Sequence, residues 1–77
     1  MLNVRNGIRM SVMLSEGEKN RLMECVGLVL AGKIRVLHGY RVKVLGYDHI
    51  KKGVVIQYLD NKEISVLTKI HEIRRLI

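Results

Sequence analysis

Proline, phenylalanine and tryptophan are absent from this chain of 77 residues, and cysteine occurs only once. A lone cysteine excludes an internal disulfide and is typical of a reducing compartment, so we expect a cytoplasmic protein. Cys25 stands among apolar neighbours and is expected to be a small buried hydrophobe. Without Phe and Trp, the core has to be built from aliphatic side chains, and only Tyr40, Tyr47 and Tyr58 can stack on a base.

Acidic residues are also scarce. Seven Asp and Glu stand against fourteen Lys and Arg, which gives a formal net charge of +7. The excess lies in residues 33–77 and is densest between Lys33 and Lys52, where Asp48 is the only acid. A basic field of this kind attracts polyanions, nucleic acid first and acidic proteins or membranes second.

Long apolar runs are missing as well, and none approaches the roughly 18 residues that span a bilayer. Residues 1–14 hold Arg5 and Arg9 without an apolar stretch behind them, which argues against a signal peptide. Apolar residues alternate from Ile8 to Leu14, which predicts a half-buried strand or an N-terminal arm. The length fits one domain over 1–77 with a modest core. Because no apolar run could span a bilayer, no membrane partner is expected.

A capping box predicts where the first helix begins. Ser15 and Glu18 have the Ser-x-x-Glu spacing in which each side chain satisfies a backbone amide of the other residue. Gly32 is expected to stop the helix, whereas Gly27 costs about 1 kcal/mol relative to Ala within it. Residues Val26–Leu30 are therefore either its last turn or already extended. The expected buried stripe consists of Leu22, Cys25, Val26 and Val29.

From residue 33 onward the apolar period changes from 3.6 to 2, which predicts β-hairpins. In the first hairpin, a three-residue loop over 38–40 sets Val36 opposite Val42, whereas a two-residue loop would set it opposite Arg41. The three-residue loop is preferred because it gathers apolar side chains on one face.

The same reasoning predicts a second hairpin with a three-residue loop over 60–62, which sets Ile56 opposite Val66. Asn61 or Lys62 would then take a left-handed backbone conformation. The segments 46–49 and 52–53 mark the turn between the hairpins. Thr68–Ile77 fits either a short helix or a 3₁₀ turn leading into a last strand.

These elements predict an α+β domain: a strand or arm over 1–14, a helix over 15–32 and a small, strongly bent antiparallel β-barrel over 33–77. The segment Val42–His49, with its Gly-Tyr-Asp turn, and the apolar strand Gly53–Leu59 resemble the SH3-like and Sm-like small barrels. This resemblance implies the fold and no binding residue, because the RNA-contacting pairs of the Sm-like families are missing here.

Catalytic and metal-binding patterns are not found in the sequence. The serines lack a nucleophile-elbow context, and His38, His49 and His71 are too far apart for a ligand motif. Asp48 beside His49 is expected to form a turn and not a catalytic dyad. We therefore expect a protein that is not an enzyme and needs no metal or cofactor.

The functional prediction is nucleic-acid binding through a basic strand face, in a phage- or plasmid-type accessory or regulatory factor. In the preferred register Arg35 faces Lys43 across the hairpin, and an exposed tyrosine beside them would stack on a base. The alternative is an SH3-like module that binds an acidic protein, an acidic or apolar peptide, or itself, through the helix surface or an open strand edge. The helix surface would use Met23, Leu28 and Leu30, which do not all fit on the buried stripe and would otherwise fill the core. The candidate nucleic-acid-binding residues are Lys33, Arg35, Tyr40, Arg41, Lys43, Tyr47, Lys51 and Lys52.

Overall fold

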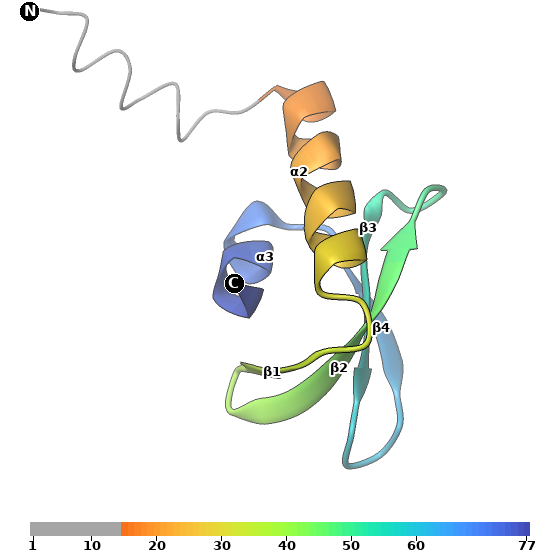
Figure 1. Cartoon of the computed structure of the whole chain (residues 1–77), viewed down its shortest axis with the longest axis vertical. Helices are drawn as coiled ribbons and strands as arrows, with labels where there is room; N and C mark the ends of the chain where they lie inside the picture. Colours follow the sequence, from red (N-terminus) through yellow and green to blue (C-terminus); the bar gives the residue numbers. More distant parts are fainter. Residues whose placement is uncertain (1–14) are drawn as a thin grey trace, which may run out of the picture.

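The computed structural model describes residues 15–77 and shows two helices packed against a four-stranded sheet (Figure 1). The α+β class is thus confirmed, whereas the strand or arm predicted over 1–14 lies outside the described residues. In chain order the elements are helix α2 (Glu16–Val29), strands β1 (Ile34–Leu37), β2 (Tyr40–Asp48), β3 (Gly53–Tyr58) and β4 (Ile64–Leu67), and helix α3 (Ile70–Leu76).

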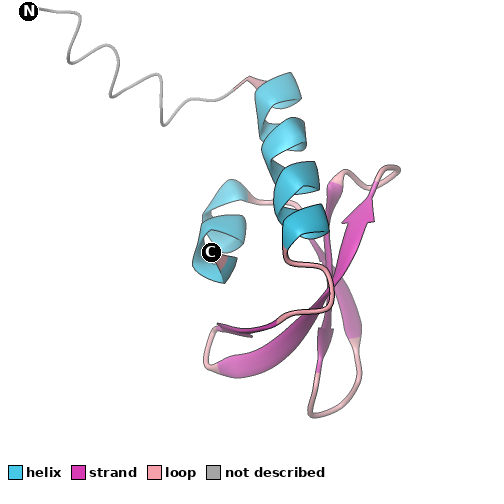
Figure 2. Cartoon of the chain, in the orientation of Figure 1, coloured by secondary structure: helices cyan, strands magenta, loops and turns pink. Residues whose placement is uncertain are grey.

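The sheet is an antiparallel meander in the order β1-β2-β3-β4. Helix α2 contacts β2 and β3, and α3 contacts β1, so both helices cover the same side of the sheet (Figure 2). We call this side the inner face and the opposite side the outer face. Within residues 15–77, β1 and β4 form the two edges and do not pair with each other, so the sheet is open and the predicted barrel closure is not seen.

Helix α2 begins at the predicted capping box. The Glu18 amide donates to Ser15 Oγ at 3.2 Å, and the Ser15 amide donates to Glu18 Oε1 at 3.1 Å. The Ser15 amide, and after it the Ser15 hydroxyl that donates to the same Oε1 at 3.0 Å, stabilise the carboxylate and lower the pKa of Glu18. The helix continues to Val29, so the segment Val26–Leu30 is almost entirely helical and its extended alternative is wrong.

The buried side of α2 is rotated relative to the predicted stripe. Met23, Val26, Gly27 and Leu30 face the sheet, and Leu22 is half-buried. Cys25 is exposed, and so is Val29, so the predictions that both are buried were wrong. The observed set keeps the helical i, i+3, i+4, i+7 spacing but begins one residue later.

Gly27 is the reason for this rotation. A Cβ atom at Gly27 would lie 2.8 Å from the carbonyl oxygen of Gly46 and 3.0 Å from Tyr47 Cβ. Helix α2 therefore rests on β2 at a separation that only glycine permits, next to the β-bulge between Val44 and Gly46. The residue that costs helix propensity is the contact point that orients the helix.

The register of the first hairpin differs from the predicted one. His38 and Gly39 form a two-residue loop with φ values of 52° and 81°, and Val36 pairs with Arg41. Positive φ at both loop positions is typical of the type I′ turn, whose twist matches that of paired strands. The prediction failed because it assigned Val36 to the core, whereas Leu37 is the buried residue of β1 and Val36 is exposed.

The second hairpin is also shifted by one residue. Ile56 pairs with Ser65, and Val55, not Ile56, pairs with Val66. The loop is longer than predicted. The Tyr58 amide donates to the Glu63 carbonyl, so the last hydrogen bond between the strands encloses a four-residue loop, 59–62. Lys62 takes the left-handed conformation, with φ of 63°, as one of the two predicted alternatives.

Thr68–Ile77 contains α3, which decides between the two alternatives for this segment in favour of a short helix. Ile73 and Leu76 are buried, and Ile77 is exposed. The core between the sheet and the helices is aliphatic, as the composition predicts. Its buried members are Met23, Val26, Leu30, Leu37, Val42, Val44, Val54, Ile56, Leu67, Ile73 and Leu76.

We predict opposite effects for two Gly→Ala substitutions within α2. Gly27→Ala gains helix propensity but forces the added methyl group into β2, so it should destabilise the fold by about 1 to 3 kcal/mol. Gly17→Ala is the matched control: its Cβ would have only an Arg21 nitrogen at 4.0 Å. It should stabilise the fold by up to about 1 kcal/mol. Urea unfolding of both variants measures this difference, and a Gly27→Ala variant as stable as the wild type would contradict the packing.

Candidate functional site

The outer face carries two of the predicted cations. Val42 and Val44 are buried on the inner face, so the alternation along β2 places Arg41 and Lys43 on the outer one, where both are exposed. Lys43 pairs with Ile34 on one side and with Gln57 on the other, which puts it at the middle of the sheet. None of the side chains on this part of the face is acidic; they are Ile34, Val36, Arg41, Lys43, Leu45, Val55, Gln57, Ile64 and Val66.

The outer face is also strongly aliphatic. Val36 is 60% exposed and Ile64 is 62% exposed, on opposite edge strands of the sheet. Ile34 and Leu45 are exposed as well, and they lie beside the two cations. The outer face therefore carries two positive charges surrounded mainly by aliphatic side chains, and none of the outer-face residues named above is aromatic.

Arg35 lies on the other side of the sheet and does not face Lys43. It pairs with Val42, and its Nε donates to the carbonyl oxygen of Leu76 at 3.0 Å. A guanidinium at this place satisfies an unpaired carbonyl at the C-terminus of α3 and complements the helix dipole. The predicted contact of Arg35 with Lys43 is wrong because it depended on the three-residue loop.

The remaining predicted cations lie at the ends of strands. Lys33 is exposed just before β1, where its carbonyl accepts a hydrogen bond from the Val44 amide. Strand alternation puts Lys33 on the same side as Arg35. Lys51 and Lys52 are exposed in the β2–β3 turn. The structure thus brings Arg41 and Lys43 together and separates them from the other four cations.

Asp48 builds the β2–β3 turn, as predicted. Its Oδ1 accepts from the amides of Ile50 at 2.8 Å and Lys51 at 3.0 Å. These two hydrogen bonds, with that of Lys51 the larger cause, lower the pKa of Asp48. Asp48 therefore fixes the loop that presents Lys51 and Lys52.

The two tyrosines of the predicted site lie on the inner side and near opposite ends of β2. Tyr47 packs against the core and meets the His49 ring edge-to-face, with ring centroids 5.0 Å apart. Tyr40 is 57% exposed, and its ring is 6.2 Å from that of Tyr58, again edge-to-face. Neither tyrosine is on the outer face with Arg41, so the structure does not assemble the predicted combination of cations and stacking rings.

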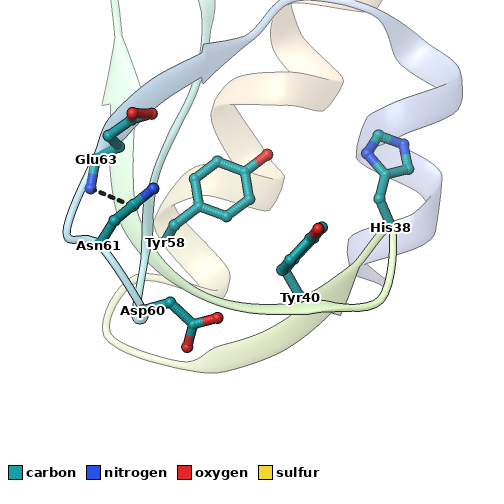
Figure 3. Close-up of a pocket in the computed structure, with 6 residues that line it drawn as sticks. All are labelled: His38, Tyr40, Tyr58, Asp60, Asn61 and Glu63. Atoms are coloured by element: carbon teal, nitrogen blue, oxygen red, sulfur yellow. Dashed lines mark hydrogen bonds between the residues drawn. The ribbon is translucent and has the colours of Figure 1, made fainter.

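Tyr40 and Tyr58 instead form part of a pocket that the sequence did not suggest. The pocket has a volume of about 440 Å³ and opens between the β1–β2 and β3–β4 turns (Figure 3). We call it the tyrosine pocket. The signal in the sequence was the pair of acids Asp60 and Glu63, in and just after the second hairpin loop, which become neighbours of Tyr40 only once the sheet is formed. Its lining residues are His38, Tyr40, Tyr58, Asp60, Asn61 and Glu63.

The helix surface predicted to seal an oligomer is partly used in the core. Met23 and Leu30 are buried, whereas Leu28 is 65% exposed. A small apolar hollow of about 150 Å³ lies beside this exposed end of α2, lined by residues that include Cys25 and Ile77.

The described residues contain neither a metal-binding cluster nor a membrane-spanning helix. No group of three or more His, Cys, Asp or Glu side chains is arranged around a common point within residues 15–77. Neither α2 nor α3 has the length and apolar character needed to cross a bilayer. No protein-family model, curated protein or solved structure matches the chain significantly.

The lowered pKa of Asp48 predicts how the turn responds to acid. The ionised Asp48 carboxylate contributes its full stability to the fold above pH 3.8, the ordinary pKa of an aspartate. This contribution is lost as the pH falls through the lower pKa of Asp48 in the folded state. Asp48→Asn cannot titrate, so the stability gap between wild type and variant should narrow below pH 3.8. Urea unfolding between pH 2 and 6 tests this, and a constant gap would show that the carboxylate is not selectively stabilised by folding.

Proposed function

We propose that this is a non-enzymatic nucleic-acid-binding protein that uses the outer face of its sheet. The observation that supports this is the pair Arg41 and Lys43, exposed at the middle of a sheet face that no described helix covers and whose central part has no acidic side chain. Positive charge without neighbouring carboxylates attracts phosphate with little local compensation.

The chemistry of these side chains favours contacts to the backbone of a nucleic acid. The Arg41 guanidinium can donate two parallel hydrogen bonds to a phosphate, and Lys43 adds a compact charge beside it. The aliphatic residues around them suit the apolar edges of sugars and bases, but offer no hydrogen bonds that discriminate bases. We therefore expect binding that depends on salt more than on sequence.

The cations at the strand ends have a secondary role in this proposal. Lys51 and Lys52 extend the positive field beyond the sheet and help to attract the polyanion from a distance. Lys33 acts in the same way. Arg35 contributes charge, but its guanidinium is held by the Leu76 carbonyl, so it is not expected to lead the contact.

Two finer features suggested by the sequence, the kind of barrel and the kind of factor, belong to the proposed function. The four-stranded meander, bent at the bulge after Val44, supports a relationship to the SH3-like small barrels. A cytoplasmic accessory or regulatory factor of the phage or plasmid type fits a small basic protein with a single thiol.

We predict that the double variant R41Q/K43Q binds nucleic acid more weakly than the wild type. The slope of log affinity against log salt should fall by about 1 for each cation that contacts a phosphate. Fluorescence anisotropy with labelled single- and double-stranded DNA and RNA, over a salt series, measures both quantities.

The matched control for this experiment is R74Q/R75Q, which removes the same charge from exposed positions of α3. It should weaken binding less and leave the slope closer to that of the wild type. Equal losses in the two variants would mean that net charge alone attracts the nucleic acid. No binding of the wild type at low salt would refute the proposal.

The exposed aliphatic residues favour one alternative, a module that binds a protein or a second copy of itself. Val36 and Ile64 would lie at the two sides of such a contact, on the edge strands, and together with Ile34 and Leu45 they give the face more apolar surface than phosphate binding requires. An acidic partner would in addition neutralise Arg41 and Lys43.

For self-assembly, this alternative predicts that V36S/I64S reduces association without unfolding the chain, since both side chains are already largely exposed. Sedimentation equilibrium at several protein concentrations measures the association. The I50S variant, which alters an exposed residue of the β2–β3 turn, serves as the control. A wild type that stays monomeric throughout excludes the self-assembly form of the alternative.

A further inference from the structure

The tyrosine pocket has a chemistry opposite to that of the outer face. Asp60 and Glu63 line it together with Tyr40 and Tyr58, and no Lys or Arg is among its lining residues. We propose that this pocket binds the guanidinium group of an arginine side chain presented by a protein. This inference is independent of the nucleic-acid proposal, because the two surfaces share no residue.

The tyrosines supply two walls for a cation. Their rings are inclined at 81° with centroids 6.2 Å apart, so they form a corner and not a closed stack. Tyr40 is 57% exposed, which leaves ring surface free on the pocket side. A planar cation that enters this corner and lies over the face of a ring is within the range of a cation–π interaction.

The carboxylates supply the charge. Both extend from the β3–β4 turn, which Asn61 holds in place by accepting a hydrogen bond from the Glu63 amide at 2.9 Å (Figure 3). Among residues 15–77, neither Asp60 nor Glu63 takes part in an ion pair. In a chain with a net charge of +7, two acids that form no ion pair with the cations of residues 15–77 are available for an external cation.

The shape and charge of the pocket select among ligands. A phosphate or nucleic-acid backbone is disfavoured by the two carboxylates. An arginine side chain fits better than lysine because its guanidinium is flat enough to stack on tyrosine and can also donate forked hydrogen bonds to a carboxylate. A volume of about 440 Å³ leaves room for the arginine and parts of its neighbours, as in a peptide.

The direct test uses three short peptides of the form acetyl-Gly-X-Gly-amide, with X as arginine, lysine or citrulline. Citrulline has nearly the shape of arginine but no charge. Titration of the ¹⁵N-labelled chain with the arginine peptide should shift the amide signals of Tyr40, Tyr58 and residues 60–63. The lysine peptide should bind more weakly, and the citrulline peptide should cause no comparable shifts. Shifts of equal size with citrulline, or none with arginine, would overturn the proposal.

Variants then assign the binding to the pocket. D60N/E63Q removes both charges from an exposed turn, and Y40L removes a largely exposed ring, so neither should unfold the chain. Each is expected to lower the affinity for the arginine peptide about tenfold. E16Q/E72Q removes the same charge from the first turns of the two helices and should leave the affinity nearly unchanged. Equal losses in D60N/E63Q and E16Q/E72Q would overturn the assignment.

The source of the arginine is either another protein or a second copy of this chain, which is itself rich in arginine. If a second copy provides it, sedimentation equilibrium should show wild-type association that D60N/E63Q abolishes and V36S/I64S retains. If the wild type binds the arginine peptide and is monomeric, the arginine belongs to another protein.

Discussion

The contact of Gly27 with the backbone of β2 is the constraint on which the rest of the structure depends. It allows α2 to approach the sheet at the bulge beside Gly46 more closely than any side chain would permit. Once the helix is seated there, its rotation determines that Met23, Val26 and Leu30 enter the core. The helix then covers the inner face of β2 and β3, and neither α2 nor α3 covers the opposite face. The candidate surfaces follow from this division.

The separation of a covered inner face from an uncovered outer face also places the charged residues on different surfaces. Arg41 and Lys43 lie on the uncovered face among aliphatic residues. Asp60 and Glu63 lie beside the tyrosines, at the end of the sheet that carries the β1–β2 and β3–β4 turns. Arg35, although part of the same basic stretch of sequence, is used internally to hold the end of α3. A strongly positive chain thus presents one cationic surface and one acidic pocket, and the two are suited to partners of different chemistry.

Features that depend on neighbours in sequence were predictable, and those that depend on packing were not. The capping box of Ser15 and Glu18 involves residues three apart, so it could be read directly. The hairpin registers could not, because Ile and Val occur on both faces of these strands and the alternation does not show which face is buried. Assigning Val36 in place of Leu37 to the core moved Arg35 to the wrong side. The tyrosine pocket was missed because its lining residues come from two separate hairpins.

The hairpin turns have a consequence for how this sheet folds. His38, Lys52 and Lys62 each adopt a left-handed backbone conformation, with φ between 52° and 63°. This conformation costs residues other than glycine about 1 kcal/mol or more, so these turns are poorly populated in the unfolded chain. None of the hairpins is therefore well suited to nucleate folding from its turn. We expect the turns to form after the strands have been brought together by the distant contact of α2 with β2, so that the folding rate responds to Gly27 more than to the loop residues.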